Sequence, residues 1–275
     1  MKIYFKIGLF FLLLPIHSQD IGFSNLLKEV YPDKNEFNYP KNYKVNTARN
    51  SYSDVNIIIK TKVGDIIDFN AFSKTLNNIQ FNNVKDVPIE ENTGLDSRTE
   101  QFKGLINPHV IRRAPFRVFE ILKPVHNNIT AETKYSLLNL KIYIPEKIDS
   151  GNHFVNLSFR IGSKTFDLKL KVNVYDYVIP KLSESNFFYT NWFNLGKMEE
   201  YHGVERWTNE WYIMLDKYAK VMAEGRQNCI IIPGELIYLN DGEFQLDEQK
   251  MISFINIFRK YGFKYFLSFF LRKFW

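Results

Sequence analysis

Four residues in the last third of the chain have side chains that suit a sugar: Asn191, Trp192, Trp207 and Glu235. Asn191 and Trp192 come near the end of an aromatic run, and Glu235 follows a second apolar run. An aromatic ring beside amide and carboxylate groups favours a carbohydrate, because the apolar face of a sugar stacks on the ring while its hydroxyls need donors and acceptors. In β/α folds the loops that follow the strands build the binding site. The pattern therefore predicts a substrate-binding wall formed by these four residues.

The tryptophans also have a simpler interpretation, in which they only seal the mouth of the fold. Both interpretations stay open for Trp192, whereas the packing role is favoured for Trp207. Trp211 lies on the apolar stripe of a predicted helix and is expected in the core.

Compact catalytic and cofactor motifs are missing from the sequence. It contains no glycine-rich phosphate loop, paired CxxC, HExxH or nucleophile elbow. Glu199 and Glu200 are expected to be solvated, because a working acid/base pair must face one substrate bond. The single cysteine, Cys229, is expected to be a buried and inert strand residue, since isoleucines follow it. No cofactor, metal ligand or catalytic residue is therefore predicted.

Residues 185–275 show the alternation of strands and helices that is typical of a β/α fold. The predicted elements are, in chain order, strand Phe187–Phe193, loop Asn194–Trp207, helix Asn209–Glu224, strand Cys229–Ile232, helix Asp247–Tyr261 and a strand from Phe263. Thr208 is the expected N-cap of the first helix and Gly225 its stop. The order β-α-β-α-β implies parallel strands. A complete (β/α)8 barrel takes roughly 250 residues, so this region is expected to be a truncated TIM-barrel segment.

Residues 19–180 are predicted to form an antiparallel β-sandwich, so the fold class is mixed. The expected strands are Val55–Thr61, Val63–Phe69, Phe116–Leu122, Leu138–Ile144, His153–Ile161 and Lys164–Tyr175. Apolar and polar residues alternate along the last two strands, which places one face of a sheet in the core. Gly162-Ser163 between them predicts a tight hairpin turn.

The first residues and the charge pattern limit the cellular location and the partners. Residues 1–18 are predicted to be a signal peptide, because Lys2 and Lys6 precede an apolar run from Ile7 to Ile16. That run is too short to span a bilayer, so an exported chain without a membrane span is expected. The 275 residues carry a net charge of +6 that is dispersed along the chain. No basic block tracks a phosphate backbone, which argues against nucleic acid as a partner.

Several motifs in the C-terminal region resemble the start of a known catalytic domain. In chain order they are FFYTNWFNL, YHGVERWTNEW, LDKYAKVMAEGRQN and IIIP. Together they resemble glycoside hydrolase family 123, a group of β-N-acetylgalactosaminidases. The preceding segment FDLKLKVNVYDYVIP resembles that family's N-terminal β-sandwich, which leads into a TIM barrel. The resemblance is specific from Tyr175 to Pro233.

The resemblance implies a substrate-assisted, retaining hydrolysis of β-linked N-acetylhexosamine. In such a reaction the substrate's acetamido oxygen attacks the anomeric carbon, a glutamic acid protonates the leaving oxygen, and an adjacent aspartate orients the amide. In the family this pair lies at the end of a later barrel strand, so the catalytic residues are expected beyond Trp275 and the chain alone is expected to be inactive. The alternative is a non-catalytic carbohydrate-binding or surface-interaction protein built on the sandwich.

Overall fold

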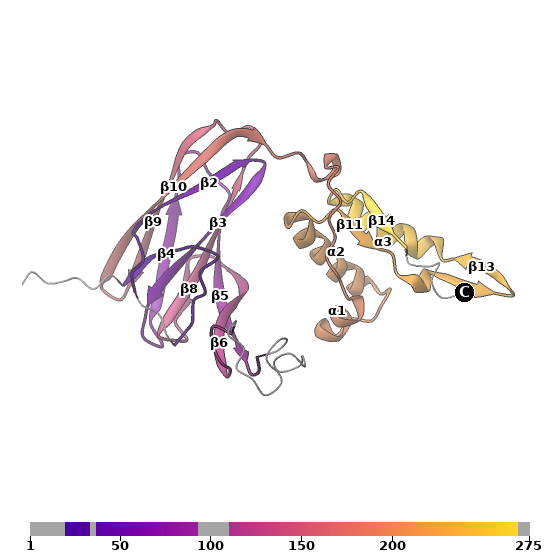
Figure 1. Cartoon of the computed structure of the whole chain (residues 1–275), viewed down its shortest axis with the longest axis horizontal. Helices are drawn as coiled ribbons and strands as arrows, with labels where there is room; N and C mark the ends of the chain where they lie inside the picture. The colour runs from indigo at the N-terminus through magenta and orange to yellow at the C-terminus, as the bar shows by residue number, and fades with distance from the viewer. Residues whose placement is uncertain (1–19, 34–36, 93–109, 269–275) are drawn as a thin grey trace, which may run out of the picture. The chain divides into compact units, whose positions relative to one another are not determined.

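The computed structural model describes residues 20–33, 37–92 and 110–268, and the expected signal peptide lies outside them. The chain divides into two units, Met1–Val178 and Ile179–Trp275 (Figure 1). Each unit has a hydrophobic core of its own. Within the described ranges, no helix has the length and apolar character needed to cross a membrane.

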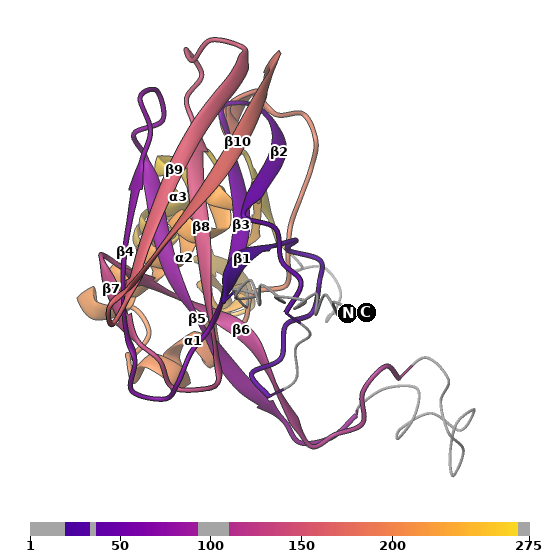
Figure 2. The ribbon, with the colours of Figure 1, turned by 90° about the vertical axis from the view of Figure 1, so that its left-hand side faces the viewer.

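The first unit consists of two five-stranded sheets. One sheet has the strand order β1 (Ile21–Ser24), β3 (Ser51–Lys60), β8 (Tyr135–Ile144), β5 (Ile79–Ile89) and β6 (Phe116–Val125). The other has the order β2 (Asn42–Arg49), β10 (Lys164–Val178), β9 (Gly151–Ile161), β4 (Ile66–Phe72) and β7 (Asn128–Thr130), and it faces the viewer in Figure 2.

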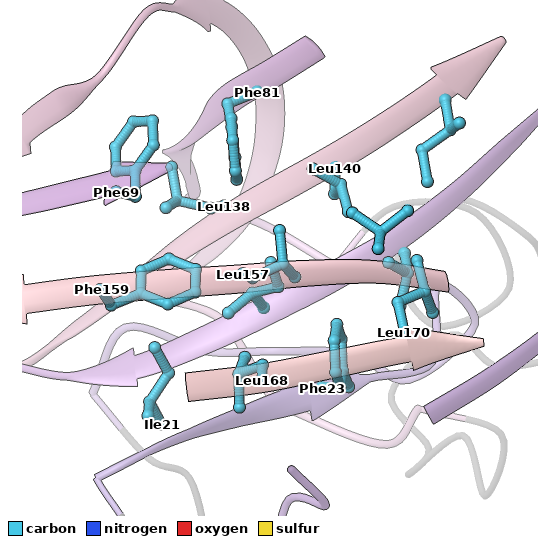
Figure 3. Close-up of a cluster of buried hydrophobic side chains, with 14 of the residues drawn as sticks. Ile21, Phe23, Phe69, Phe81, Leu138, Leu140, Leu157, Phe159, Leu168 and Leu170 are labelled. Carbon is cyan, nitrogen blue, oxygen red and sulfur yellow. The ribbon is translucent and has the colours of Figure 1, made fainter. Parts of the chain in front are cut away.

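Alternating apolar residues of both sheets meet in one core (Figure 3). Along β9, for example, Val155, Leu157 and Phe159 are buried and the residues between them are exposed. Leu138 and Leu140 of β8 reach the same cluster from the other sheet. The hairpin between β9 and β10 turns at Gly162, whose φ of 57° suits glycine. The predicted period-two pattern and hairpin are therefore confirmed.

The pairing of the first unit differs from the prediction in one respect. β2 runs parallel to β10, in a register that pairs Asn42 with Lys169, whereas a fully antiparallel arrangement was expected. More than a hundred residues separate the two strands, so no hairpin constrains their direction. Strands β1, β2, β5 and β7 were not predicted. Polar residues obscure the alternation along β2 and β5, and β1 and β7 are only four and three residues long.

The second unit contains three α-helices and four short strands among its described residues. The helices are α1 (Leu195–His202), α2 (Asn209–Glu224) and α3 (Glu248–Lys260), with the 3-10 turns η2 (Leu182–Glu184) and η3 (Gly234–Leu236). The strands are β11 (Cys229–Ile231), β12 (Ile237–Asn240), β13 (Glu243–Leu246) and β14 (Tyr265–Leu267). β11 pairs in parallel with β14, and β12 forms an antiparallel hairpin with β13.

Local signals determine the bounds of α2 and α3. The hydroxyl of Thr208 accepts a hydrogen bond from the backbone N–H of Trp211, and Gly225 follows the last residue of α2. The carboxylate of Asp247 caps α3 in the same way, by accepting from the N–H of Lys250. Trp211 is fully buried, as are Phe254 and Phe258 of α3. Both predicted helices and the core position of Trp211 are confirmed.

The predicted strand Phe187–Phe193 is wrong, because this segment has no regular strand ladder. It is held beside β11 by the fully buried Asn228 instead. The Asn228 side chain accepts from the N–H of Tyr189 at 2.9 Å and donates to the carbonyl of Phe187 at 2.7 Å. The N–H of Asn228 donates to the carbonyl of Tyr189 at 3.1 Å. One amide side chain thus replaces the two backbone groups that a neighbouring strand would have supplied.

Replacing Asn228 should destabilise the second unit. Asn228→Ala leaves the N–H of Tyr189 and the carbonyl of Phe187 without these partners, which we expect to lower the free energy of unfolding by roughly 2–4 kcal/mol. All four tryptophans belong to the second unit, so urea unfolding followed by tryptophan fluorescence reports on this unit. Asn240→Ala, at an exposed position of β12, is the control. A loss below about 0.5 kcal/mol for Asn228→Ala would contradict the role of this side chain.

Candidate functional site

A cavity of about 440 Å³ lies at the carboxyl end of β11. One side is formed by the residues that follow Tyr189, including Asn191 and Trp192, and the other by the chain from β11 to η3, including Glu235. The structure thus brings together three of the four residues predicted to bind substrate. Trp192 is 88% exposed. An exposed ring, an amide and a carboxylate around one cavity can contact the faces and hydroxyls of a small polar ring.

Trp207, the fourth predicted residue, does not line this cavity. It packs against the core of the second unit, with its ring centroid 4.8 Å from that of Trp211. Its backbone has a φ of 69°, a conformation that is uncommon for residues other than glycine. These contacts agree with the packing role that the sequence favoured for Trp207.

Helix α1 occupies most of the segment that was predicted to be a loop. Asn194 caps it by accepting a hydrogen bond from the N–H of Lys197 at 2.9 Å, and Gly203 ends it with a φ of 62°. Buried Met198 attaches the helix to the core. An asparagine and a glycine nine residues apart are the local signal that could have indicated this helix.

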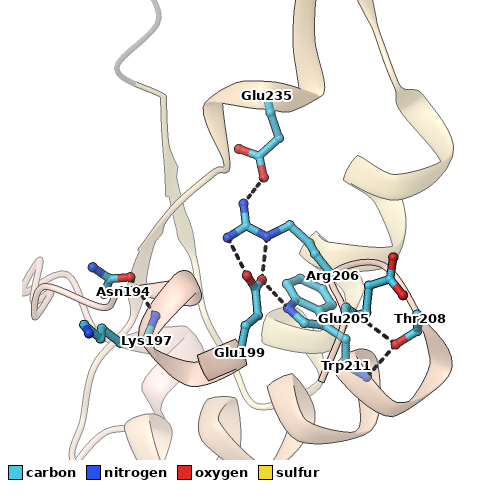
Figure 4. A network of polar contacts seen from close by, with 8 residues as sticks. All are labelled: Asn194, Lys197, Glu199, Glu205, Arg206, Thr208, Trp211 and Glu235. Atoms are coloured by element: carbon cyan, nitrogen blue, oxygen red, sulfur yellow. Dashed lines mark hydrogen bonds and ion pairs between the residues drawn. The ribbon is translucent and has the colours of Figure 1, made fainter. Parts of the chain in front are cut away.

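Arg206 connects three elements around the cavity (Figure 4). Its guanidinium donates to both carboxylate oxygens of Glu199 on α1, at 2.5 and 3.1 Å. A third nitrogen donates to Oε1 of Glu235 in η3. Glu199 also accepts a hydrogen bond from the indole N–H of Trp211 on α2, at 2.8 Å. The expectation that Glu199 is solvated is therefore wrong, because it lies on the face of α1 that meets Arg206 and Trp211.

The electrostatics of this network favour fixed charges. The hydrogen bonds from Arg206 to Glu199, and then to Glu235, raise the pKa of the guanidinium above its ordinary value, although partial burial lowers it. The guanidinium therefore stays charged and holds Glu235 at the rim by one oxygen. Oε2 of Glu235 has no hydrogen-bond partner among the described residues. That oxygen can accept a hydrogen bond from a ligand hydroxyl.

The remaining candidate chemistry of the second unit is limited. Cys229 is fully buried in β11, as predicted, and burial raises the pKa of its thiol. A thiol that is protonated and inaccessible does not act as a nucleophile. In the portions of the chain that the structure describes, no group of three or more histidine, cysteine, aspartate or glutamate side chains is placed to hold a metal ion.

A solved structure shares the fold of this chain. It is a family 123 glycoside hydrolase from Clostridium perfringens that hydrolyses glycolipid glycans. The TM-score is 0.68 at 14% sequence identity, and the match covers 89% of this chain and 46% of that enzyme. This chain therefore spans a little under half the length of the enzyme it matches. At this identity the likeness concerns the fold.

The other comparisons carry no argument about function. The CooA pilin subunit from enterotoxigenic Escherichia coli matches with a TM-score of 0.29 and 11% identity, over 59% of this chain and all of that chain (100%). A PapD-like domain of human CEP192 matches with a TM-score of 0.24 and 8% identity, over 64% of this chain and 96% of that chain. No protein-family model matches the sequence, and no curated protein matches it.

Replacing Glu199 should separate its charge from its hydrogen bond to Trp211. Glu199→Gln keeps an acceptor for the indole but removes the ion pair, and we expect the unfolding free energy to fall by roughly 1 kcal/mol. Glu199→Leu also leaves the buried indole N–H without its acceptor, for an expected loss of roughly 2–3 kcal/mol. Urea unfolding followed by tryptophan fluorescence measures both.

The neighbouring Glu200 provides a matched control. Its side chain is 69% exposed and pairs with Lys197 one helical turn away. We expect Glu200→Gln to change the unfolding free energy by less than about 0.5 kcal/mol. Equal losses for the substitutions at the two positions would contradict a special role for Glu199.

Proposed function

We propose that this chain is part of an exported glycoside hydrolase that cleaves β-linked N-acetylhexosamine by a substrate-assisted, retaining mechanism. In this proposal the first unit is the β-sandwich that precedes the catalytic domain, and the second unit is the beginning of a TIM barrel. The observation that carries the proposal is the likeness of fold to a family 123 glycoside hydrolase over 89% of this chain.

The position of the cavity supports the same proposal. β11 and β14 are parallel, and the cavity lies at the carboxyl end of β11, where the loops of a β/α fold build the substrate site. Trp192 offers a ring for the apolar face of a sugar. Asn191 offers an amide, and the free oxygen of Glu235 offers an acceptor for a hydroxyl. These residues would form one wall of the substrate site.

The residues that line the cavity suit the binding of a sugar, but they do not include the two carboxylates that the reaction needs. Substrate-assisted hydrolysis needs an acid for the leaving oxygen and a second carboxylate that orients the acetamide. Among the residues that line the cavity, Glu235 is the sole carboxylate, and one of its oxygens is bound by Arg206. The catalytic pair would therefore come from other parts of the enzyme.

The proposed wall should bind sugar through Trp192. We expect methyl N-acetyl-β-D-galactosaminide to bind the full chain weakly, and Trp192→Ala to weaken binding by about 3- to 10-fold, the range for one lost aromatic stack. Ligand-observed NMR titration measures the affinity. Tyr201→Ala is the control, because Tyr201 is an exposed aromatic residue of the same unit, at 82%, and does not line this cavity. Equal affinities for wild type and Trp192→Ala would contradict the assignment.

The chain alone should not turn over substrate. We expect no release of nitrophenol from an aryl N-acetyl-β-D-galactosaminide above the rate of buffer, because the cavity lacks a second carboxylate. Measurable hydrolysis that disappears in Glu235→Gln would show that this chain carries its own catalytic acid. Binding without hydrolysis, weakened in Trp192→Ala, is the result that the proposal requires.

A further inference from the structure

A second cavity lies on the outer face of the sheet formed by β2, β10, β9, β4 and β7. Its volume is about 520 Å³. The residues between the buried positions of these strands point away from the core, and several of them line the cavity. Figure 2 looks onto this sheet. The cavity belongs wholly to the first unit and is separate from the site at β11.

The strand register places a row of exposed side chains across four strands. Phe72 of β4 pairs with Asn156 of β9, Asn156 pairs with Lys169 of β10, and Lys169 pairs with Asn42 of β2. All four line the cavity. At the usual spacing of neighbouring strands the row spans roughly 15 Å. That length fits an extended chain of sugar rings better than a single ring.

The amides of this cavity are available to a ligand. Among the described residues, Asn42, Asn70 and Asn156 have no side-chain hydrogen-bond partner. The other sheet shows the contrast: Asn82 and Asn139 are buried there and hydrogen-bond each other. A free amide both donates and accepts, as vicinal hydroxyls and acetamido groups require.

An aromatic ring at one end of the row adds a stacking surface. Phe72, the last residue of β4, is 59% exposed, whereas Ile67 and Phe69 of the same strand are buried in the core. An exposed phenyl ring beside amides is the combination that suits the apolar face of a sugar.

The charge around the cavity is in positive excess. Lys41 and Lys169 line it, and Asp167 is the acidic residue of the lining. Lys44 and Lys171 pair across β2 and β10 next to this row. Within the described part of the chain, none of these four lysines forms an ion pair, and the ammonium of Lys169 lies over the ring of Phe154 instead.

A concave surface with a surplus of one charge attracts ligands of the opposite charge. We propose that this cavity binds an acidic oligosaccharide, with its carboxylates beside the lysines, its hydroxyls on the three asparagine amides and one ring against Phe72. This inference does not depend on the proposed hydrolase function, because it concerns binding by the other unit.

A pair of ligands that differ only in charge tests the proposal. The probes are an unsulfated chondroitin tetrasaccharide and the same tetrasaccharide with its carboxylates reduced to alcohols, each titrated calorimetrically into the full chain. We expect saturable binding of the acidic form and at least tenfold weaker binding of the reduced form. Equal affinities, or no saturable binding of the acidic form at millimolar concentration, would overturn the proposal.

Variants locate the binding site. We expect Asn156→Ala and Lys169→Ala each to weaken binding at least fivefold. Asn173→Ala and Lys123→Ala are matched controls outside the cavity and should stay within twofold of wild type. Trp192→Ala should also leave this affinity unchanged. A loss only in Trp192→Ala would place the ligand at β11 and overturn the assignment to the sheet. Equal binding of tripolyphosphate, lost in the same variants, would show that charge alone is recognised and would contradict an oligosaccharide site.

Discussion

The buried amide of Asn228 determines the geometry of the second unit. The Asn228 side chain hydrogen-bonds the backbone of Phe187 and Tyr189. The backbone carbonyl of Asn228 accepts from the N–H groups of Lys264 and Tyr265, each at 3.0 Å. One residue thus joins three segments that are distant in sequence. Because a buried backbone group without a partner is costly, these contacts leave the segment little freedom to move away from β11. The chain that continues from Tyr189 consequently reaches the carboxyl end of β11, where Trp192 meets the same cavity as Glu235.

Arg206 holds the side of that cavity that is formed by Glu235. A guanidinium offers several donors in one plane, so it can bind Glu199 with two nitrogens and Glu235 with a third. The buried indole of Trp211 donates a hydrogen bond to the carboxylate of Glu199 and so connects Glu199 to the core. The orientation of Glu235 is therefore coupled to the packing of α1 and α2. A binding group held in this way loses little conformational freedom when a ligand arrives, which is the condition for useful affinity from a few contacts.

Features with local causes could be predicted from the sequence, and features with distant causes could not. The bounds of α2 follow from Thr208 and Gly225, which lie at its own ends. The irregular segment around Tyr189 depends on Asn228, a partner 39 residues away, so its aromatic composition alone suggested a strand. Glu199 and Glu200 are chemically identical neighbours, and only the helical face that each occupies decides which one is bound. Three of the four proposed sugar contacts share a cavity, but the rule that loops after strands converge accounts for Glu235 alone, which follows β11. Asn191 and Trp192 are brought there by the irregular segment that Asn228 holds.

The two cavities differ in the one property that most strongly selects among sugars. In the lining of the cavity at β11 the carboxylate of Glu235 is paired with Arg206, which also pairs with Glu199 behind it, so this lining has no excess of positive charge. At the cavity on the outer sheet, Lys41 and Lys169 form no ion pair among the described residues, and they outnumber Asp167, the carboxylate of the lining. Charge compensation inside a site favours a neutral ligand, whereas an uncompensated site favours an ion of opposite sign. Since each cavity belongs to a unit with its own core, the two preferences can be altered one at a time.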